Sequence, residues 1–540
     1  MEEILFSQAS LILLFPFFPT CSWLLCARAE FTAFPHFLLS RLLIWRRIGK
    51  IIMESLISRS SGITMNPWTS PQDIQNQLQS FGSNICLIAG DKSYTFQDID
   101  ETSAKLADSL YQKGVSMGDI LGIYGFSPEE TYFILFALWK LEAIPLPLNH
   151  YWPLDKVQKH IHQLSSSFLL HKKTPTLFDS SHTFSYSLER ISDNSLNNKN
   201  ISNLLFTSSS TGKPKGVCHT FSNHFYSAMG SYQNIPFHQG HRWALTLPLY
   251  HVGGLSLIFR SLLKGGTLVI PKGKEKPGNP SFSQFLNKNK ITHLSFVPTQ
   301  LKRFMLNLNI LPSSISAILV GGAPIPKRLI IEGLKKGLPL YPTYGMTEMA
   351  SQICTAPKET PLQFLCQTLG KTLPFREVKI SEDGEILVKG KVLFPFYLTE
   401  LGLQKPALQK GWYPTRDLGT LTEEGYLIWK GRKDNLFISG GENIHPEEIE
   451  KTLLDFDEIE EAIVLPQKDP EYGQVPIAFI RCSSSLSYSE MEKKLALHLP
   501  TFMIPRKFYP FPKDFPKGLK INRKELIKWW EKNSPLERSR

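Results

Sequence analysis

The fold class is decided by residues 118–141, GDILGIYGFSPEETYFILFALWKL. Gly118–Phe126 is an apolar run with the length of a buried strand, and Glu129–Leu141 places apolar residues at helical spacing. Apolar runs of strand length return at Ile291–Val297 and Ile315–Val320. Because short buried strands that alternate with helices are typical of largely parallel sheets, the pattern predicts an α/β fold.

Length and composition indicate a globular protein with more than one domain. The chain has 540 residues, of which 42% are hydrophobic and 20% charged, and single cores rarely grow to that size. The formal net charge is +12, but the Lys and Arg residues are scattered along the chain. We interpret them as a solvated basic surface that suits anionic substrates, and we predict no nucleic-acid partner.

The cysteines indicate the compartment. There are seven of them, an odd number, and no two have the CxxC spacing of a zinc or redox motif. We therefore expect free thiols in a reducing compartment, and a cytoplasmic protein.

The first 65 residues differ from the rest of the chain. No residue from Ile4 to Ala27 is charged, a length that can span a bilayer. Acidic residues precede this run where a signal peptide has basic ones, and two prolines interrupt it. Three interpretations stay open: a true start at Met53 or Met65, a membrane anchor, and a cleaved signal. Residues 1–65 are left out of the predicted fold, and membrane association is expected only through residues 4–27.

The strongest local motif is FTSSSTGKPKGV, residues 206–217. A run of hydroxyl residues, Thr207–Thr211, is followed by Gly212, Lys213 and Lys215. Hydroxyl, backbone N–H and ammonium donors together suit a polyphosphate. Since Pro214 separates the two lysines, the spacing is not that of a Walker A loop. On composition alone, a Ser/Thr-rich linker is the alternative.

Four shorter motifs follow in the chain. They are YGMTE at 344–348, WYPTRD at 412–417, GRKD at 431–434 and GLKINR at 518–523. Glu348 is a solvated acid if it stands alone, but beside a phosphate loop it becomes a candidate Mg²⁺ ligand, with Thr347 as a phosphate donor. Lys520 lies on a short segment that begins with glycine.

The order of these five motifs resembles that of the acyl-adenylate-forming superfamily, which contains acyl-CoA synthetases, adenylation domains and luciferases. The resemblance covers about residues 66–530. It implies a large N-terminal domain, at 66–433, of two mixed sheets flanked by helices plus a β-barrel. It also implies a small, mobile C-terminal α+β domain, a lid, at 434–540. The boundary falls where the pattern changes after the apolar run Tyr426–Trp429.

The resemblance also implies a role for each motif residue. The β- and γ-phosphates are assigned to Thr207, Ser208, Ser209, Ser210, Thr211, Gly212 and Lys215. The adenine is assigned to Gly321, Gly322, Ala323, Pro324, Tyr344 and Gly345. The remaining roles are the α-phosphate for Thr347, Mg²⁺ for Glu348, the ribose for Asp417 with Arg432 nearby, the hinge for Asp434, and a bridge between carboxylate and phosphate for Lys520.

One position departs from the superfamily's pattern, because Ser209 stands where glycine is usual. If that position needs a positive φ, serine costs roughly 1 kcal/mol or more. Lys215, Glu348, Asp417 and Lys520 are all present, so we still expect an active enzyme.

The implied chemistry explains the residue types. A carboxylate is a poor electrophile until its oxygen joins a good leaving group, which attack on the α-phosphate of ATP provides. Two anions meet in that step, so Mg²⁺ and a lysine are needed to offset their charge. We therefore predict ATP and Mg²⁺ as cofactors, a small-molecule carboxylic acid as substrate, and CoA as the thiol that accepts the acyl group.

Within the superfamily, four runs are similar to those of the o-succinylbenzoate–CoA ligases of menaquinone biosynthesis. They are LPLYHVGGL at 247–255 with IFR at 258–260, GMTEMASQ at 345–352, SGGENIHP at 439–446, and 518–530. His251 is assigned as a gate of the acyl pocket, with a structural histidine as the alternative. Arg260 pairs either with a substrate carboxylate or in a salt bridge on the helix surface. Another aryl- or fatty-acyl-CoA ligase, or a standalone adenylation domain that loads a carrier protein, stays open.

Overall fold

The structure is a computed structural model that describes residues 66–172, 185–196, 198, 200–207, 215–482, 487–512 and 523–533. The segment 4–27 and the rest of residues 1–65 lie outside this part of the chain. Within it, no helix has both the length and the apolar character needed to cross a membrane. Five cysteines lie within it, and all are free thiols as predicted: Cys86, Cys218, Cys354, Cys366 and Cys482.

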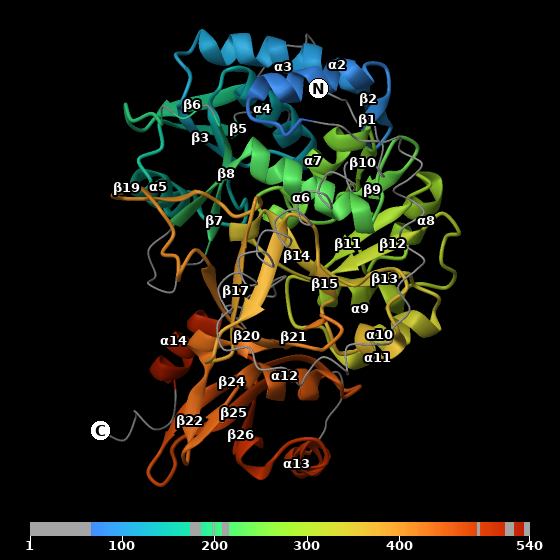
Figure 1. Cartoon of the computed structure of the whole chain (residues 1–540), viewed down its shortest axis with the longest axis vertical. Coiled ribbons are helices and arrows are strands. Elements are labelled where there is room, and N and C mark those ends of the chain that lie inside the picture. Colours follow the sequence, from blue (N-terminus) through green and yellow to red (C-terminus); the bar gives the residue numbers. More distant parts are fainter. Residues whose placement is uncertain are drawn as a thin grey trace, which may run out of the picture. The chain divides into compact units, whose positions relative to one another are not determined.

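A nine-stranded sheet is the largest element of the fold (Figure 1). Its strands, in spatial order, are β15 (Lys371–Thr372), β14 (Ser351–Thr355), β13 (Leu340–Met346), β12 (Ala317–Val320), β11 (His293–Phe296), β9 (Arg242–Ala244), β10 (Thr267–Ile270), β1 (Ile85–Ala89) and β2 (Lys92–Thr95). The six strands from β13 to β1 are parallel, and β15, β14 and β2 are antiparallel edges. The apolar runs predicted as strands at 291–297 and 315–320 are β11 and β12.

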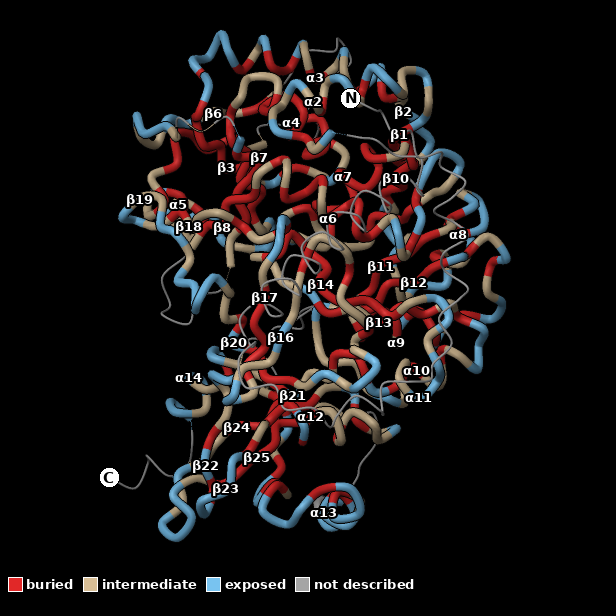
Figure 2. Tube along the Cα trace, in the orientation of Figure 1, coloured by how far each residue is buried: buried red, intermediate tan, exposed pale blue. Residues whose placement is uncertain are grey.

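The stretch at 118–141 forms a strand and a helix as predicted. They are β3 (Ile120–Tyr124) and α4 (Pro128–Lys140). The helix begins at Ser127, whose backbone N–H donates to the Glu130 carboxylate at 2.7 Å, while its hydroxyl accepts from the Glu130 N–H. Since α4 is apolar on nearly every face, it is buried along most of its length, as Figure 2 shows.

Three further sheets accompany the first. One has the order β4 (Ile144–Pro147), β3, β5 (Phe168–Lys172), β6 (Tyr186–Arg190) and is parallel except at β6. The second, antiparallel, has the order β19 (Gly402–Gln404), β18 (Phe396–Thr399), β8 (Lys215–Thr220), β7 (Ile201–Thr207). The third, also antiparallel, has the order β16 (Arg376–Ile380), β17 (Glu385–Gly390), β20 (Tyr413–Leu421), β21 (Leu427–Arg432).

Helices connect these strands up to residue 365. Besides α4 they are α2 (Pro71–Phe81), α3 (Phe96–Tyr111), α5 (Leu154–Gln163), α6 (Phe221–Asn234), α7 (Val252–Lys264), α8 (Ser281–Lys288), α9 (Pro298–Leu306), α10 (Lys327–Lys335) and α11 (Leu362–Leu365). Between β13 and β14 the chain makes a short 3-10 helix, η1 (Thr347–Met349). This turn carries two of the predicted site residues.

The residues after Asp434 have cores of their own. Their strands are β22 (Phe437–Ser439), β23 (Glu442–Ile444), β24 (Ile459–Asp469), β25 (Gly473–Cys482) and β26 (Lys507–Pro510), and their helices are α12 (Pro446–Leu454), α13 (Tyr488–Ala496) and α14 (Arg523–Asn533). The two buried clusters here draw every member from position 437 onward. The predicted fold class, α/β with a small C-terminal α+β domain, is therefore confirmed. The boundary at 433/434 stays a prediction.

Candidate active site

A cleft of about 3390 Å³ opens where parallel strands of the nine-stranded sheet end. Leu245, Val297 and Gly321, which follow β9, β11 and β12, all line it. In open α/β sheets, ligands bind beyond the carboxyl ends of the strands. Ordinary ligand pockets measure about 300–1,000 Å³, so this cleft has room for more than one small molecule.

Two paired strands flank the predicted phosphate loop in the sequence. Thr207 ends β7, Lys215 begins β8, and the two residues are partners in the antiparallel register. Both line the cleft. Ser208, Ser209, Ser210, Thr211 and Gly212 lie outside the described residues, so their assigned role stays a prediction.

The predicted adenine segment follows β12 directly. Gly321, Gly322, Ala323 and Pro324 all line the cleft. A Cβ on Gly321 would lie 2.7 Å from the carbonyl oxygen of Thr343 in the neighbouring strand, and Gly322 has a φ of +80°. The close approach at Gly321 and the positive φ at Gly322 both favour glycine, so the chain can pass close to β13 as it reaches the cleft.

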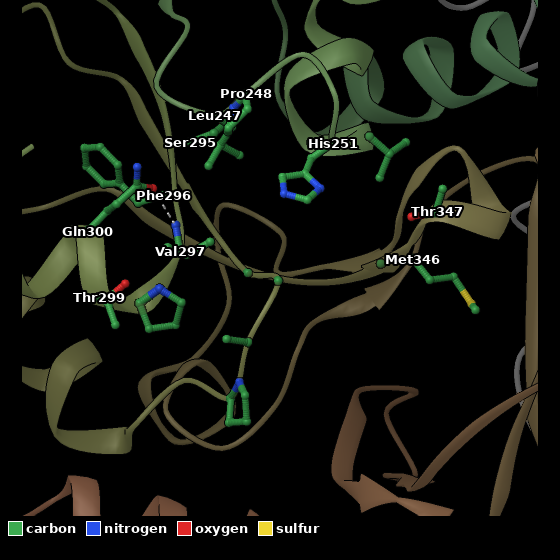
Figure 3. Close-up of a pocket in the computed structure, with 18 of the residues that line it drawn as sticks. Leu247, Pro248, His251, Ser295, Phe296, Val297, Thr299, Gln300, Met346 and Thr347 are labelled. Carbon is green, nitrogen blue, oxygen red and sulfur yellow. Dashed lines mark hydrogen bonds between the residues drawn. The ribbon is translucent and has the colours of Figure 1, made fainter. Parts of the chain in front are cut away.

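Tyr344, Gly345, Thr347 and Glu348 are placed in the cleft by the end of β13 and by η1. The hairpin between β13 and β14 is tight, because a Cβ on Gly345 would lie 2.1 Å from the carbonyl oxygen of Ser351. Figure 3 shows Thr347 and Met346 on one side of the pocket and Phe296 and Val297 on another.

The carboxylate of Glu348 is held by tyrosines. The hydroxyl of Tyr397 donates to Oε1 of Glu348 at 2.9 Å, and it lies 2.7 Å from the hydroxyl of Tyr413. Burial raises the pKa of Glu348, and the hydrogen bond from Tyr397 opposes that shift. An oxygen ligand in this position suits a hard cation such as Mg²⁺.

The predicted ribose carboxylate is buried and already oriented. Asp417 on β20 accepts from the hydroxyl of Tyr344 at 2.6 Å and from Nη1 of Arg432 at 3.1 Å. Asp417 and Arg432 are register partners in neighbouring strands. Since each carboxylate oxygen can accept about two hydrogen bonds, Asp417 retains acceptor capacity for two hydroxyl groups.

Asp434, the predicted hinge residue, is paired with two arginines. Nε of Arg416 lies 2.8 and 2.9 Å from its two oxygens, and Nη2 of Arg432 lies 3.7 Å away. The hydrogen bonds from Arg416 lower the pKa of Asp434. Arg416 itself has a φ of +63°, which few residues other than glycine adopt.

On the acyl side, His251 precedes the first turn of α7 and lines the cleft. Figure 3 shows its imidazole ring pointing into the pocket. A Cβ on Gly254 would lie 2.3 Å from the carbonyl oxygen of Pro248, so the helix begins close against the preceding segment. The gating role assigned to His251 stays a prediction.

The predicted salt bridge of Arg260 on the helix surface is wrong. Arg260 lies on the inner side of α7, is 4% exposed, and lines the cleft. Its Nη2 donates to the side-chain oxygen of Gln352 at 2.7 Å, and its guanidinium lies 5.1 Å from the centre of the Trp243 ring. Nε and Nη1 have no hydrogen-bond partner in the described part of the chain. Burial lowers the pKa of Arg260 to about 9.

The sequence-based prediction missed several residues of the site. Tyr397 and Tyr413 contact the Glu348 network, and Arg416 pairs with Asp434. The only local signal for Tyr413 and Arg416 was their place beside Asp417 in the WYPTRD motif. Lys520 lies outside the described residues, so its assigned role stays a prediction.

The cleft brings together the ends of the two strands that flank the predicted phosphate loop, a glycine segment and two oriented carboxylates, an arrangement that suits a nucleotide. The family model described as AMP-binding enzyme matches residues 74–398, and the one described as AMP-binding enzyme C-terminal domain matches residues 448–521. The chain belongs to the AMP-binding enzyme family, as the motifs predict.

Within that family the chain is similar to 2-succinylbenzoate–CoA ligases. It is 32% identical to that of Bacillus subtilis over 458 residues, which cover 81% of this chain and 93% of the relative. It is 34% identical to that of Haemophilus influenzae over 433 residues, which cover 79% and 90%.

Solved structures of similar proteins agree in fold. The o-succinylbenzoate CoA synthetase of Bacillus subtilis in complex with its acyl-adenylate intermediate has a TM-score of 0.74 at 30% identity, over 86% of this chain and 98% of that one. The same enzyme in complex with ATP and magnesium ion has a TM-score of 0.73 at 31% identity, over 84% and 99%.

Proposed function

We propose that this chain is an ATP-dependent, AMP-forming 2-succinylbenzoate–CoA ligase of menaquinone biosynthesis. The similar enzymes have this name, and their sequences align with about four-fifths of this chain. The structure of one of them has been solved with an acyl-adenylate and with ATP and magnesium ion. These likenesses support ATP and Mg²⁺ as cofactors and CoA as the acyl acceptor.

The choice of substrate rests on one observation: Arg260 is buried, and two of its nitrogens lack hydrogen-bond partners within the described residues. A buried guanidinium with two nitrogens, and so three N–H groups, that lack a partner in the described part of the chain is costly unless a ligand supplies the missing acceptors. 2-Succinylbenzoate has two carboxylates, of which one is activated and the other remains an anion in the acyl pocket. Arg260, which lines the cleft, is the group that we assign to that second carboxylate.

On the nucleotide side, contacts of the described residues support the roles assigned to Asp417, Glu348 and the flanks of the phosphate loop. Asp417 is oriented by Tyr344 and Arg432 to accept from the ribose hydroxyls. Thr207 and Lys215 flank the predicted phosphate loop. Glu348, held by Tyr397, is the residue that fits Mg²⁺, which when bound offsets the negative charge of the phosphates.

The proposed reaction has two steps. A carboxylate oxygen of the acid attacks the α-phosphorus of ATP, the bond from that phosphorus to the bridging oxygen breaks, and pyrophosphate leaves. The CoA thiolate then attacks the acyl carbon, and AMP leaves with the electron pair of the acyl–oxygen bond. In the first step Lys520 is assigned to the two meeting anions, and losing one such contact typically lowers the rate by about 10²–10³.

A substrate series tests this proposal directly. Thioester formation and AMP release are measured with 2-succinylbenzoate, with 3-benzoylpropionate (which lacks the ring carboxylate) and with 2-butanoylbenzoate (which lacks the chain carboxylate). We expect 2-succinylbenzoate to be preferred by about 10²-fold, and Arg260→Met to abolish that preference. The single-carboxylate analogue that is still turned over identifies the carboxylate that is activated.

The controls separate the competing classes of enzyme. Lys520→Ala is expected to lower the rate of AMP release by about 10²–10³-fold with every acid. A medium-chain fatty acid and a set of amino acids complete the panel. Turnover of a fatty acid in place of 2-succinylbenzoate indicates a fatty-acyl-CoA ligase. Amino-acid-dependent pyrophosphate exchange without free acyl-CoA indicates an adenylation domain. An unchanged preference in Arg260→Met contradicts the assignment of Arg260.

A further inference from the structure

A chain of buried polar side chains runs from β7 and β8 to the turn that carries Glu348. Nε2 of His219 lies 2.6 Å from the carbonyl oxygen of Thr347. Nδ1 of His219 lies 3.2 Å from Nδ2 of Asn203, and Oδ1 of Asn203 lies 2.7 Å from Nε2 of His224. His219, Asn203 and His224 are fully buried, and none belongs to the motifs assigned to catalysis.

The direction of these hydrogen bonds follows from their last acceptor. A carbonyl oxygen only accepts, so Nε2 of His219 carries the proton that it donates to Thr347. Burial lowers the pKa of His219 to about 4, so its ring is neutral near pH 7, and Nδ1 accepts from the amide of Asn203. The oxygen of Asn203 then accepts from Nε2 of His224. All the donors therefore point toward Thr347.

The position of His219 joins two parts of the nucleotide site. Asn203 lies on β7, which ends at Thr207, and His219 lies on β8, which begins at Lys215. Thr347 begins η1, the turn that carries Glu348. This hydrogen bond thus connects the strands that flank the predicted phosphate loop with the turn that carries the predicted metal ligand, because Thr347 lies 128 residues farther along the chain than His219.

The other end of this chain of side chains reaches the acyl side. The ring of His224 stacks on Phe259, with ring centres 3.9 Å apart and planes at 3°. Phe259 precedes Arg260 in α7. The histidine that fixes Asn203 therefore packs against the helix that presents the guanidinium to the cleft.

We propose that His219 is a positioning residue for adenylation, which holds the carbonyl of Thr347 in register with β8 so that Lys215 and Glu348 act on the same nucleotide. This inference rests on the proposed function. It assigns His219 no contact with substrate, ATP or metal. A side chain in its place must donate at the position of Nε2 and accept at the position of Nδ1.

Two amide substitutions separate this role from simple filling of space. His219→Gln places a donor and an acceptor near the positions of Nε2 and Nδ1. His219→Asn is one methylene shorter, so it reaches Asn203 but not Thr347. ATP affinity is measured by calorimetry with and without Mg²⁺, in the absence of any acid, and kcat and the KM for ATP are measured in the complete reaction.

For His219→Asn we expect the Mg²⁺-dependent affinity for ATP to fall by about 10–100-fold and the KM for ATP to rise. For His219→Gln we expect both the affinity and the KM to return close to the wild-type values. His293→Asn is the matched control, since His293 is also buried in a strand, bonds the hydroxyl of Thr292 and, among the described residues, packs its ring against Phe237, His241 and Trp243, none of which is assigned to ATP or Mg²⁺. We expect its Mg²⁺-dependent ATP affinity to equal that of the wild type.

Equal affinities in His219→Asn, His219→Gln and the wild type would overturn the inference, as would an equal loss in His293→Asn. If His219→Asn does not fold, His219→Met, which fills the space without a donor, replaces it in the same comparison. A wild-type chain that binds Mg²⁺ and ATP but makes no acyl-CoA contradicts the proposed function alone, because the binding measurement still tests His219.

Discussion

Arg260 and Arg523 are both shielded from solvent, but their surroundings differ in charge. Arg523 begins α14, and its Nη2 lies 2.7 Å from Glu450 and 3.6 Å from Glu447, two buried carboxylates. Its Nη1 donates to the backbone carbonyl of Val464. Arg260 has an amide oxygen and an aromatic ring as neighbours and, within the described residues, no carboxylate partner.

The presence or absence of carboxylate partners distinguishes an arginine that stabilises the fold from one that is available to bind a ligand. Charges buried together offset each other's desolvation, and removing one leaves the other unpaired. A buried charge without a partner lowers the stability of the free protein and gains its partner when an anion binds. We therefore assign Arg523 to the folding of the C-terminal region and, under the proposed function, Arg260 to substrate binding.

The largest expected effect is on the paired arginine. Arg523→Met leaves Glu447 and Glu450 buried without a counter-charge, so we expect the free energy of unfolding to fall by about 3–5 kcal/mol. Urea unfolding followed by far-UV circular dichroism measures this change. Arg506→Met, at an exposed arginine, is the control and is expected to change little. Equal stabilities of the two variants would contradict the structural role of Arg523.

The unpaired arginine is expected to respond in the opposite sense. Arg260→Met removes an uncompensated buried charge, so we expect the same or a higher free energy of unfolding. Because the second carboxylate of the substrate loses its partner, kcat/KM for 2-succinylbenzoate is expected to fall by about 10²-fold or more. A clear loss of stability with unchanged kcat/KM would show that Arg260 stabilises the fold, and Arg260 and Arg523 would then have the same role.

The burial of Glu450, the partner of Arg523, is also expected to appear in the pH dependence of stability. Burial raises the pKa of Glu450 to about 7, and the charge of Arg523 opposes this shift. The folded state therefore takes up a proton near pH 7 that the unfolded state takes up only near pH 4.5, so the contribution of Glu450 to stability rises as pH falls from 8 to 5. The difference in free energy of unfolding between wild type and Glu450→Gln isolates this contribution. A difference that does not vary with pH would contradict the raised pKa.

The smallest effect is expected at an exposed, paired arginine. Arg416 is 56% exposed on its side chain and pairs with Asp434. Arg416→Gly relieves a left-handed φ, worth about 1 kcal/mol, and removes an exposed ion pair worth about 0–1 kcal/mol. We expect the free energy of unfolding to rise by less than about 1 kcal/mol. A large loss would show that the pair with Asp434 contributes far more than its exposure suggests.

The motifs for the nucleotide were readable because each is continuous in the chain. Tyr344–Glu348 and Trp412–Asp417 place their donors and acceptors a few residues apart, and the structure brings them to one cleft. The phosphate loop and Lys520 lie outside the described residues, so their predicted roles await experiment. For Arg260 the sequence left two partners open, a substrate carboxylate and a surface salt bridge, because the sequence does not show whether its side chain is buried; the structure excludes the surface salt bridge.

The sequence by itself determined the alternation of strands and helices, since the periodicity of apolar residues is a local property of the chain. It also determined the family, through short motifs whose chemistry depends on neighbouring residues. Tertiary structure alone decided which charges are paired and which polar groups are buried. The contacts of Arg260 with Gln352 and of His219 with Thr347 join residues 92 and 128 positions apart. Such contacts leave no local pattern, because the burial and partners of a side chain arise only when distant segments pack together.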